Sequence, residues 1–366
     1  MLKRLTQYLL ATLLLLSFGW AQTAPDPQQD LSSKETPKEN PAPMLHLTPL
    51  ETVVSPEVAS AFLGPFVCDE DGNLYLRSEV AGVTAIRKLN AKGERTALFE
   101  PAANPDVKIA VTGYFSIVPD GDLYVLAFAA EELNRYVLVF KPDGSYKTRI
   151  KLDPGFAWIP SALAVFPNGS LLVTGQEYDR DKKAPKLPFT GIFRSDGKLL
   201  KELNLEDDDA IHDMATDRDP RVTSVTAPTS NRAISWSQIE AAKDGNLYLM
   251  RWLSPAVFYA ISPSGHVVRR FVVDSGNPDF RPAAMHVSGN RIAILFYQPQ
   301  SMEKIMKVVD LEGHELSTYA ELREGGKPKL GMLGAAFACY TQQPERFTFL
   351  VSDENHKIEL KHAGAR

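Results

Sequence analysis

The hexapeptide Asp-Gly-Asn-Leu-Tyr-Leu occupies residues 71–76 and recurs at residues 244–249. Aspartate or asparagine beside glycine supplies the positive φ of a tight hairpin turn, and the alternating apolar residues that follow are typical of a strand. We therefore interpret the motif as structural rather than as a metal site. Looser copies of the same turn and strand are Pro119–Val125, Pro167–Val173 and Ser288–Ile294.

The spacing of these turns predicts a repeating unit. The turn glycines lie at positions 72, 121, 169, 245 and 289, so the intervals are 49, 48, 76 and 44 residues. A second turn follows each of them, as in Pro142-Asp143-Gly144 and Ser195-Asp196-Gly197. Each unit therefore contains two hairpins, or four antiparallel strands, which is typical of the blades of a β-propeller. Six units are expected, at about 57–106, 107–155, 156–232, 233–278, 279–328 and 329–362.

The last unit is one strand short, and an unassigned segment near the N-terminus could complete it. Residues 45–53 read as a strand that precedes the first unit. Pairing them with the last blade would close the ring and leave no open edge, with Pro49 at the outer edge of that blade. We therefore predict an all-β fold over residues 45–362. It is a six-bladed β-propeller of four-stranded antiparallel blades, closed by this N-terminal strand.

The repeated strand resembles the inner strand of the six-bladed propellers of the NHL-repeat and TolB-like kind. The resemblance covers nearly all of residues 45–362 and concerns architecture alone. That fold carries hydrolases, lyases, receptors and scaffolds, so it implies no single function. The sequence lacks the glycine-histidine and tryptophan-aspartate signatures of WD40 blades and the double glycine of kelch blades.

The N-terminal residues predict export. Two basic residues come first, an apolar run extends to Trp20, and Ala21 supplies a small residue, which is the order of a secretory signal. The apolar run is shorter than the roughly 20 residues of a membrane span. We expect residues 1–21 to be cleaved after Ala21, leaving a secreted or periplasmic protein without a membrane span; an uncleaved anchor is the alternative. Residues 22–44 are polar and proline-rich and are expected to be a disordered linker.

The overall charge argues against nucleic acid as a partner. The chain has 45 acidic and 40 basic residues, a net charge of −5, and loss of Lys3 and Arg4 with the signal would give 38 minus 45, or −7. Binding to nucleic acid depends on an excess of cations that this composition lacks. We expect no nucleic acid among the partners, and we expect a monomer.

No motif in the chain carries a recognisable chemistry. A Gly-x-Ser-x-Gly nucleophile motif is absent, and the seven histidines have no metal-ligand spacing. Catalytic propellers of the gluconolactonase-like kind hold a divalent metal with several oxygen ligands, whereas the inner-strand entries here supply one carboxylate, Glu57. His286 lies in mid-strand and is expected to be a core or channel residue. We predict no cofactor, no metal and no catalytic residue.

The expected loop face is aromatic and cationic. Large aromatic and arginine side chains favour protein, peptide, glycan or anionic partners, because they give contact area and planar hydrogen bonding; packing between blades is the alternative. The leading interpretation is an exported, non-catalytic binding module. The alternatives are a metal-dependent lactonase-type hydrolase or polysaccharide lyase at the central channel, and a purely structural module. The candidate binding residues are Tyr114, Trp158, Trp236, Arg251, Trp252 and Arg281.

Two irregularities interrupt the repeat. The third unit carries an acidic insertion at about 206–232, which could be a solvated loop, a recognition loop or a calcium site. Cys68 and Cys339 lie at similar heights in the first and last inner strands. They could form a disulfide across the ring closure, worth about 4–5 kcal/mol in the chain-entropy account, or remain two buried thiols.

Overall fold

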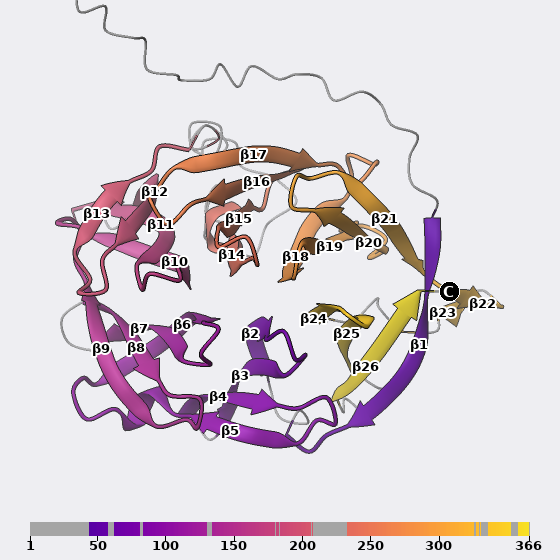
Figure 1. The fold of residues 1–366 in the computed structure, drawn as a ribbon, viewed down its shortest axis with the longest axis horizontal. Helices are drawn as coiled ribbons and strands as arrows, with labels where there is room; N and C mark the ends of the chain where they lie inside the picture. The colour runs from indigo at the N-terminus through magenta and orange to yellow at the C-terminus, as the bar shows by residue number, and fades with distance from the viewer. Residues whose placement is uncertain are drawn as a thin grey trace, which may run out of the picture. The chain divides into compact units, whose positions relative to one another are not determined.

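Strands that follow one another along the chain pair into four separate four-stranded antiparallel sheets in this computed structural model (Figure 1). The structure describes residues 44–57, 62–80, 83–129, 134–179, 181–182, 184–205, 207, 233–325, 327–328, 330, 336–352 and 358–365. The expected signal peptide, the expected linker up to residue 43, and all of the acidic insertion except Asp207 lie outside the described residues.

Each four-stranded sheet is built from two successive hairpins. The first contains β2 (Phe62–Cys68), β3 (Leu74–Val80), β4 (Val83–Leu89) and β5 (Arg95–Phe99). The second contains β6 (Ile109–Ile117), β7 (Leu123–Ala129), β8 (Arg135–Phe140) and β9 (Tyr146–Leu152). The third contains β10 (Trp158–Val165), β11 (Leu171–Asp179), β12 (Ala184–Phe193) and β13 (Leu199–Glu202). The fourth contains β14 (Gln238–Ala241), β15 (Leu247–Arg251), β16 (Ala256–Ile261) and β17 (Val267–Val273).

The remaining long strands form one eight-stranded sheet, and the prediction of a six-bladed propeller is wrong in this respect. The strand responsible is β1 (Met44–Val54). It pairs antiparallel with the C-terminal strand over Leu47–Val54, as expected of the closing strand, but it also pairs parallel with β21 over Met44–Leu47. Eleven residues are long enough to serve both neighbours, so two hairpin pairs merge into one sheet. Its order is β18 (Arg281–Ser288), β19 (Arg291–Tyr297), β20 (Lys304–Asp310), β21 (Glu315–Glu321), β1, β26 (Ile358–Ala365), β25 (Glu345–Ser352) and β24 (Ala336–Gln342).

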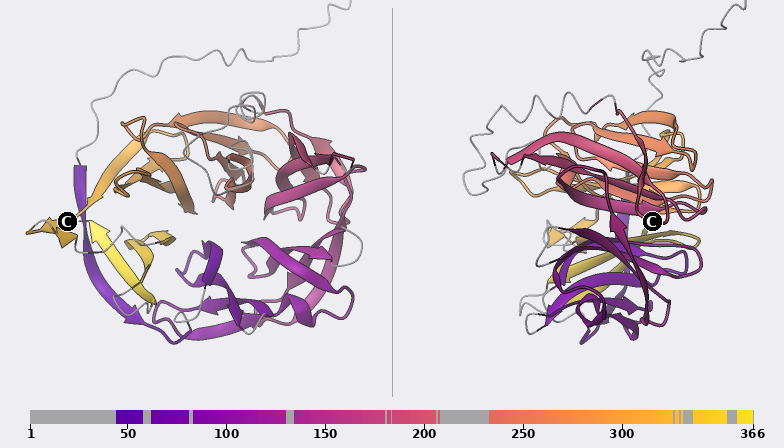
Figure 2. Two further views of the ribbon diagram at one scale, coloured as in Figure 1. Left: turned by 180° about the vertical axis from the view of Figure 1, so that it is seen from behind. Right: turned by 90° about the vertical axis from the view of Figure 1, so that its left-hand side faces the viewer.

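The innermost strands surround a common centre. Going round, β2 contacts β6, β6 contacts β10, β10 contacts β14, β14 contacts β18, β18 contacts β24, and β24 contacts β2. Figures 1 and 2 show these strands facing inward, with β5, β9, β13, β17 and β1 on the outside. The arrangement of the described residues is therefore propeller-like. Minor elements are η1 (Pro101–Ala103) and the short pair β22 (Arg323–Glu324) and β23 (Lys327–Pro328).

The hydrophobic core lies in layers between neighbouring sheets. Phe99 of β5 and Phe140 of β8 belong to one cluster shared by the first two sheets, with ring centroids 6.0 Å apart. Because both faces of a sheet are covered in this way, a middle strand can be buried at every residue. Strands β15 and β16 are buried throughout, which explains why their sequences are nearly continuous apolar runs.

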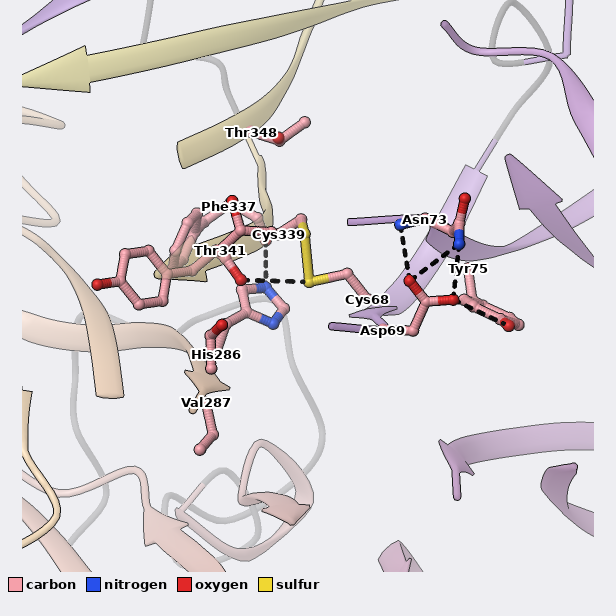
Figure 3. Close-up of a disulfide and its surroundings, with 12 residues drawn as sticks. Cys68, Asp69, Asn73, Tyr75, His286, Val287, Phe337, Cys339, Thr341 and Thr348 are labelled. Carbon is pink, nitrogen blue, oxygen red and sulfur yellow. Dashed lines mark hydrogen bonds between the residues drawn. A yellow bond between two sulfur atoms is a disulfide. The ribbon is translucent and has the colours of Figure 1, made fainter. Parts of the chain in front are cut away.

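A disulfide joins the innermost strands at the seam of the ring. Cys68 of β2 and Cys339 of β24 have Cα atoms 5.4 Å apart and are bonded through their sulfurs, so the structure has the disulfide rather than two free thiols. Figure 3 shows the bond beside Phe337 and His286. The ring is thus joined twice, through this bond on the inside and through β1 on the outside.

The second turn of a unit packs against the outer strand of the preceding sheet. A Cβ added to Gly197, which has a φ of +84°, would lie 1.9 Å from the carbonyl oxygen of Lys151 in β9. Gly169, in a first turn, has a similar φ of +81° but no atom within 4 Å of such a Cβ. The glycine at position 197 is therefore required by both conformation and space, whereas position 169 requires it for conformation alone.

This contrast predicts two different costs for the same substitution. Gly169→Ala is expected to lower the free energy of unfolding by about 1 kcal/mol, because alanine is strained at positive φ. Gly197→Ala is expected to lower it by about 3 kcal/mol, because the strand β9 must also move. Urea titrations of the two variants and the parent would measure both values, and equal losses would mean that the contact with Lys151 is unimportant.

Candidate functional site

A cavity of about 630 Å³ lies at the centre of the ring. Each innermost strand, or the turn just before it, contributes to its wall, so the cavity marks the point where all the sheets converge. Its volume falls within the usual range of small-ligand sites. The polar part of the wall contains Arg77, Ser161, Ser235, Ser237, Gln238 and Lys304. The larger apolar and aromatic residues are Phe66, Tyr114, Trp236, Leu295, Tyr297, Met302 and Phe337.

Three aromatic side chains, Trp236, Trp252 and Tyr297, form a group at this cavity that we call the aromatic trio. The indoles of Trp236 and Trp252 meet edge to face, with centroids 4.6 Å apart and an interplanar angle of 78°. The ring of Tyr297 lies 6.4 Å from that of Trp252. Trp236 is 45% exposed, a large fraction for an indole. The edge-to-face contact holds its ring in place while leaving much of its surface open.

A buried arginine supports the segment that carries Trp236. Arg251, at the end of β15, is fully buried, and its Nη1 donates to Thr174 Oγ1 at 2.8 Å and to Ser237 Oγ at 3.4 Å. Its Nη2 donates to Thr190 Oγ1 at 3.0 Å. The guanidinium thus ties the residue after Trp236 to two strands of the neighbouring sheet. Arg251 therefore positions the cavity wall from behind.

Two cationic side chains reach the cavity. Arg77 of β3 donates from Nη1 to the carbonyl oxygens of Thr112 and Gly113, which ties the first sheet to the second. Lys304 begins β20 directly opposite Tyr297 of the aromatic trio in the strand register. Burial lowers the pKa of Lys304 to about 8, against the opposing effect of the Glu321 carboxylate on β21. None of the described residues that line the cavity is an aspartate or a glutamate.

His286 braces three innermost strands below the cavity. Its Nδ1 lies 3.1 Å from Oε1 of Glu240 on β14, and its Nε2 lies 3.3 Å from the carbonyl oxygen of Phe337 on β24. Glu240 Oε2 also accepts a hydrogen bond from the backbone N–H of Val287 at 2.6 Å. The histidine is 1% exposed and fully engaged with its neighbours. Its place in the structure is that of a buried residue held between strands.

The six candidate residues do not all reach the cavity. Tyr114 and Trp236 line it, and Trp252 contacts it through Trp236. Trp158 is packed in the core against Phe193, with centroids 5.5 Å apart. It also borders a separate groove of about 650 Å³, beside Phe156 and Ile159. Arg251 is buried, and Arg281 is half-buried and donates to the carbonyl oxygen of Pro278 at 3.0 Å.

Two acidic residues singled out in the sequence, Glu57 and Asp207, are engaged in ion pairs. Glu57 lies 3.6 Å from Arg87 and 3.4 Å from Arg95. Asp207, the described residue of the acidic insertion, pairs with Arg270 of β17 at 3.0 Å. Among the residues that the structure describes, no group of three or more histidine, cysteine, aspartate or glutamate side chains is arranged to hold a metal ion.

Sequence reasoning missed Lys304 and Tyr297. Both flank the loop between the second and third strands of the hairpin pair that begins at β18. In the preceding sheet the same loop supplied Arg251 and Trp252 as candidates. Applying the same choice of loop to the next repeat would have identified Tyr297 and Lys304.

Comparisons with known proteins show the fold and no family. No family model matches the chain, and no curated protein matches it. A "Putative exported protein" from Bacteroides fragilis is 11% identical over 90% of this chain and 97% of its own, with a TM-score of 0.51. A protein of unknown function from Dyadobacter fermentans is 12% identical over 87% and 99%, with a TM-score of 0.50. The PQQ-bound aldose sugar dehydrogenase of Streptomyces coelicolor is 12% identical over 89% and 100%, with a TM-score of 0.45.

The first two likenesses, with TM-scores of 0.51 and 0.50, concern the fold alone. They do not identify the NHL-repeat or TolB-like kind, because no family model matches. Within the described part of the chain, no helix is long and apolar enough to cross a membrane.

Proposed function

We propose that this chain is an exported binding protein that recognises a protein segment, peptide or glycan at the aromatic trio without catalysing a reaction. The observation that supports it most is the exposure of Trp236 beside the central cavity. An indole is normally removed from water when nothing else requires its surface. Exposed, rigidly held aromatic side chains next to a cavity are typical of binding surfaces, where they supply large contact area at low entropic cost.

The polar wall near Trp236 is fixed in orientation before any ligand arrives. Ser161 Oγ lies within hydrogen-bonding distance of the carbonyl oxygens of Thr174 and Ile234, at 3.2 and 3.1 Å. Gln238 Oε1 accepts from the backbone N–H of Met285 at 2.7 Å. Side chains held in this way lose little conformational freedom on binding, which favours affinity.

Export is proposed on two grounds. The N-terminal order of basic, apolar and small residues is that of a secretory signal. One of the proteins with a similar fold, from Bacteroides fragilis, carries the description "Putative exported protein". We place the mature protein outside the cytoplasm, in the periplasm or the medium.

The substitution Trp236→Ala tests the proposed function. We expect it to weaken binding at least tenfold, because truncation of a central aromatic contact typically costs about 2 kcal/mol of binding free energy. The mature protein would be screened against glycan and peptide arrays, and the affinity of each hit would be measured by calorimetry for parent and variant.

Phe156→Ala is the matched control. Phe156 is also an exposed aromatic residue, at 38%, but it borders the separate groove beside Trp158. Its removal should leave the affinity unchanged. Equal losses in both variants, or no binding to either array by the parent, would contradict the proposal.

A further inference from the structure

If the proposed function holds, the residues of the cavity wall restrict the chemical class of the ligand further. We propose that the ligand is an acidic saccharide, with a sugar ring against Trp236 and its carboxylate at Lys304. Three independent features of the wall lead to this ligand class: its charge, its flat aromatic surface and its hydrogen-bonding groups.

The charge of the wall selects an anion. Arg77 and Lys304 are the charged residues among the described residues that line the cavity, and both are cationic. They come from different sheets, on β3 and β20, so the positive potential spans the cavity. The chain as a whole is acidic, with a net charge of −5, so this local excess of cations runs against the overall composition. A cleft lined by one sign of charge raises the local concentration of ligands of the opposite sign.

The aromatic trio favours a sugar ring as the body of that anion. The C–H face of a pyranose carries partial positive charge and is flat enough to lie against the electron-rich face of an indole. The hydroxyl groups of the same ring require directional partners at its rim. Ser161, Ser235 and Gln238 provide them on the wall beside Trp236. A peptide side chain with a carboxylate would use Lys304 but would leave this row of hydrogen-bonding groups with little to recognise.

The position of Lys304 links the two features. Lys304 is opposite Tyr297 in the register of β19 and β20, and the Tyr297 ring lies 6.4 Å from that of Trp252, which contacts Trp236. A cation therefore stands at one end of the aromatic surface. A ligand that pairs a ring with a carboxylate can contact both ends at once.

The partial burial of Lys304 makes this contact strong. Water is partly excluded from the ammonium group, so its pKa falls to about 8, and an arriving carboxylate would stabilise the charged form. The groups that face it are Glu321 on β21 and Tyr297 on β19, and Glu303 is the residue that precedes it in the chain. Glu321 Oε1 already accepts from the backbone N–H of Leu330 at 2.7 Å, so part of that carboxylate is committed elsewhere.

The experiment compares acidic oligosaccharides with their carboxyl-reduced counterparts. The probes are uronate oligomers of several sugars, each paired with the neutral oligomer made from it by reduction. We expect the parent protein to bind at least one acidic oligomer tenfold or more tightly than its neutral counterpart. Lys304→Met should abolish this preference while leaving the affinity for the neutral oligomer within about twofold. Lys304→Arg, which keeps the charge, should retain much of the preference.

Lys141→Met is the control for overall charge. Lys141 is an exposed residue in a turn of the second sheet and does not line the cavity. Lys141→Met removes one positive charge, as Lys304→Met does, and should leave the preference for the acidic oligomer intact.

A second measurement on the parent protein does not depend on folding of a variant. The sugar carboxylate stays ionised above pH 5, whereas Lys304 loses its proton near pH 8. The preference for the acidic oligomer should therefore be full at pH 6 and decline between pH 8 and pH 10.

The outcomes separate this inference from the proposed function. Equal affinity for acidic and neutral oligomers would overturn the inference and leave the proposed function standing. Binding of a peptide that depends on Trp236, without binding of any saccharide, would also overturn the inference and leave the proposed function standing. The absence of binding to every saccharide and every peptide would overturn both.

Discussion

Replacing Cys68 and Cys339 together by alanine is expected to lower the free energy of unfolding by about 5 kcal/mol. The two residues are 271 positions apart, so their bond closes about three quarters of the unfolded chain into a loop. In the chain-entropy account, the stabilisation grows with the length of the closed loop. Guanidinium titration of parent and double variant under oxidising conditions would measure the difference. Alanine is preferred to serine because Cys339 is buried and an added hydroxyl would need a partner.

Reduction provides the control for this prediction. A reducing agent should shift the parent's unfolding midpoint to that of the double variant and leave the variant's own midpoint unchanged. Counting thiols in the denatured, unreduced parent would show directly whether the bond is present. A parent whose midpoint does not respond to reduction would contradict the expected contribution of the bond.

Removing β1 is expected to have an effect of similar or larger size. A chain that begins at Ser55 lacks every pairing of β1 with β21 and β26, and it lacks Leu47, which is fully buried between them. Loss of a buried leucine alone costs about 2–5 kcal/mol, and the broken ladder adds to that. We expect such a chain to unfold without a cooperative transition, and to aggregate through the exposed edges of β21 and β26.

A chain that begins at Met44 is the comparison, because it keeps all of β1. Its thermal melting curve, followed by circular dichroism, should match that of the mature protein. Similar losses in both shortened chains would mean that residues before Met44 matter as much as β1, contrary to this prediction.

The local parts of the fold could be predicted from the sequence because they depend on neighbouring residues. A glycine such as Gly72 adopts positive φ, here +76°, wherever it stands in this turn, so hairpins followed directly from the repeat. The pairing of residues 45–53 with the last strand followed from an open edge that needed a partner. The number of separate sheets could not be predicted in this way. It depends on whether an eleven-residue strand reaches one neighbour or two, which is decided by long-range packing.

The candidate site shows the same division. Trp158 and Trp236 look alike in the sequence, since both are aromatic residues at the start of an inner strand. Trp158 is 5% exposed because Phe189 and Phe193 of β12 cover it, whereas Trp236 is 45% exposed although its ring meets that of Trp252. Exposure depends on residues contributed by distant strands, and no local pattern carries that information.

The double role of β1 has a consequence for how the protein is made. Thr48 of β1 donates to the carbonyl oxygen of Gly364, a residue synthesised 316 positions later. During translation β1 therefore lacks its antiparallel partner until the last strand leaves the ribosome, and its buried leucine stays uncovered on that side in the meantime. Contacts so distant along the chain form slowly, because a long loop must close first. We therefore expect completion of the ring to be the final event of folding. A chain interrupted before β26 would expose the unpaired edge of β1 to proteases and chaperones.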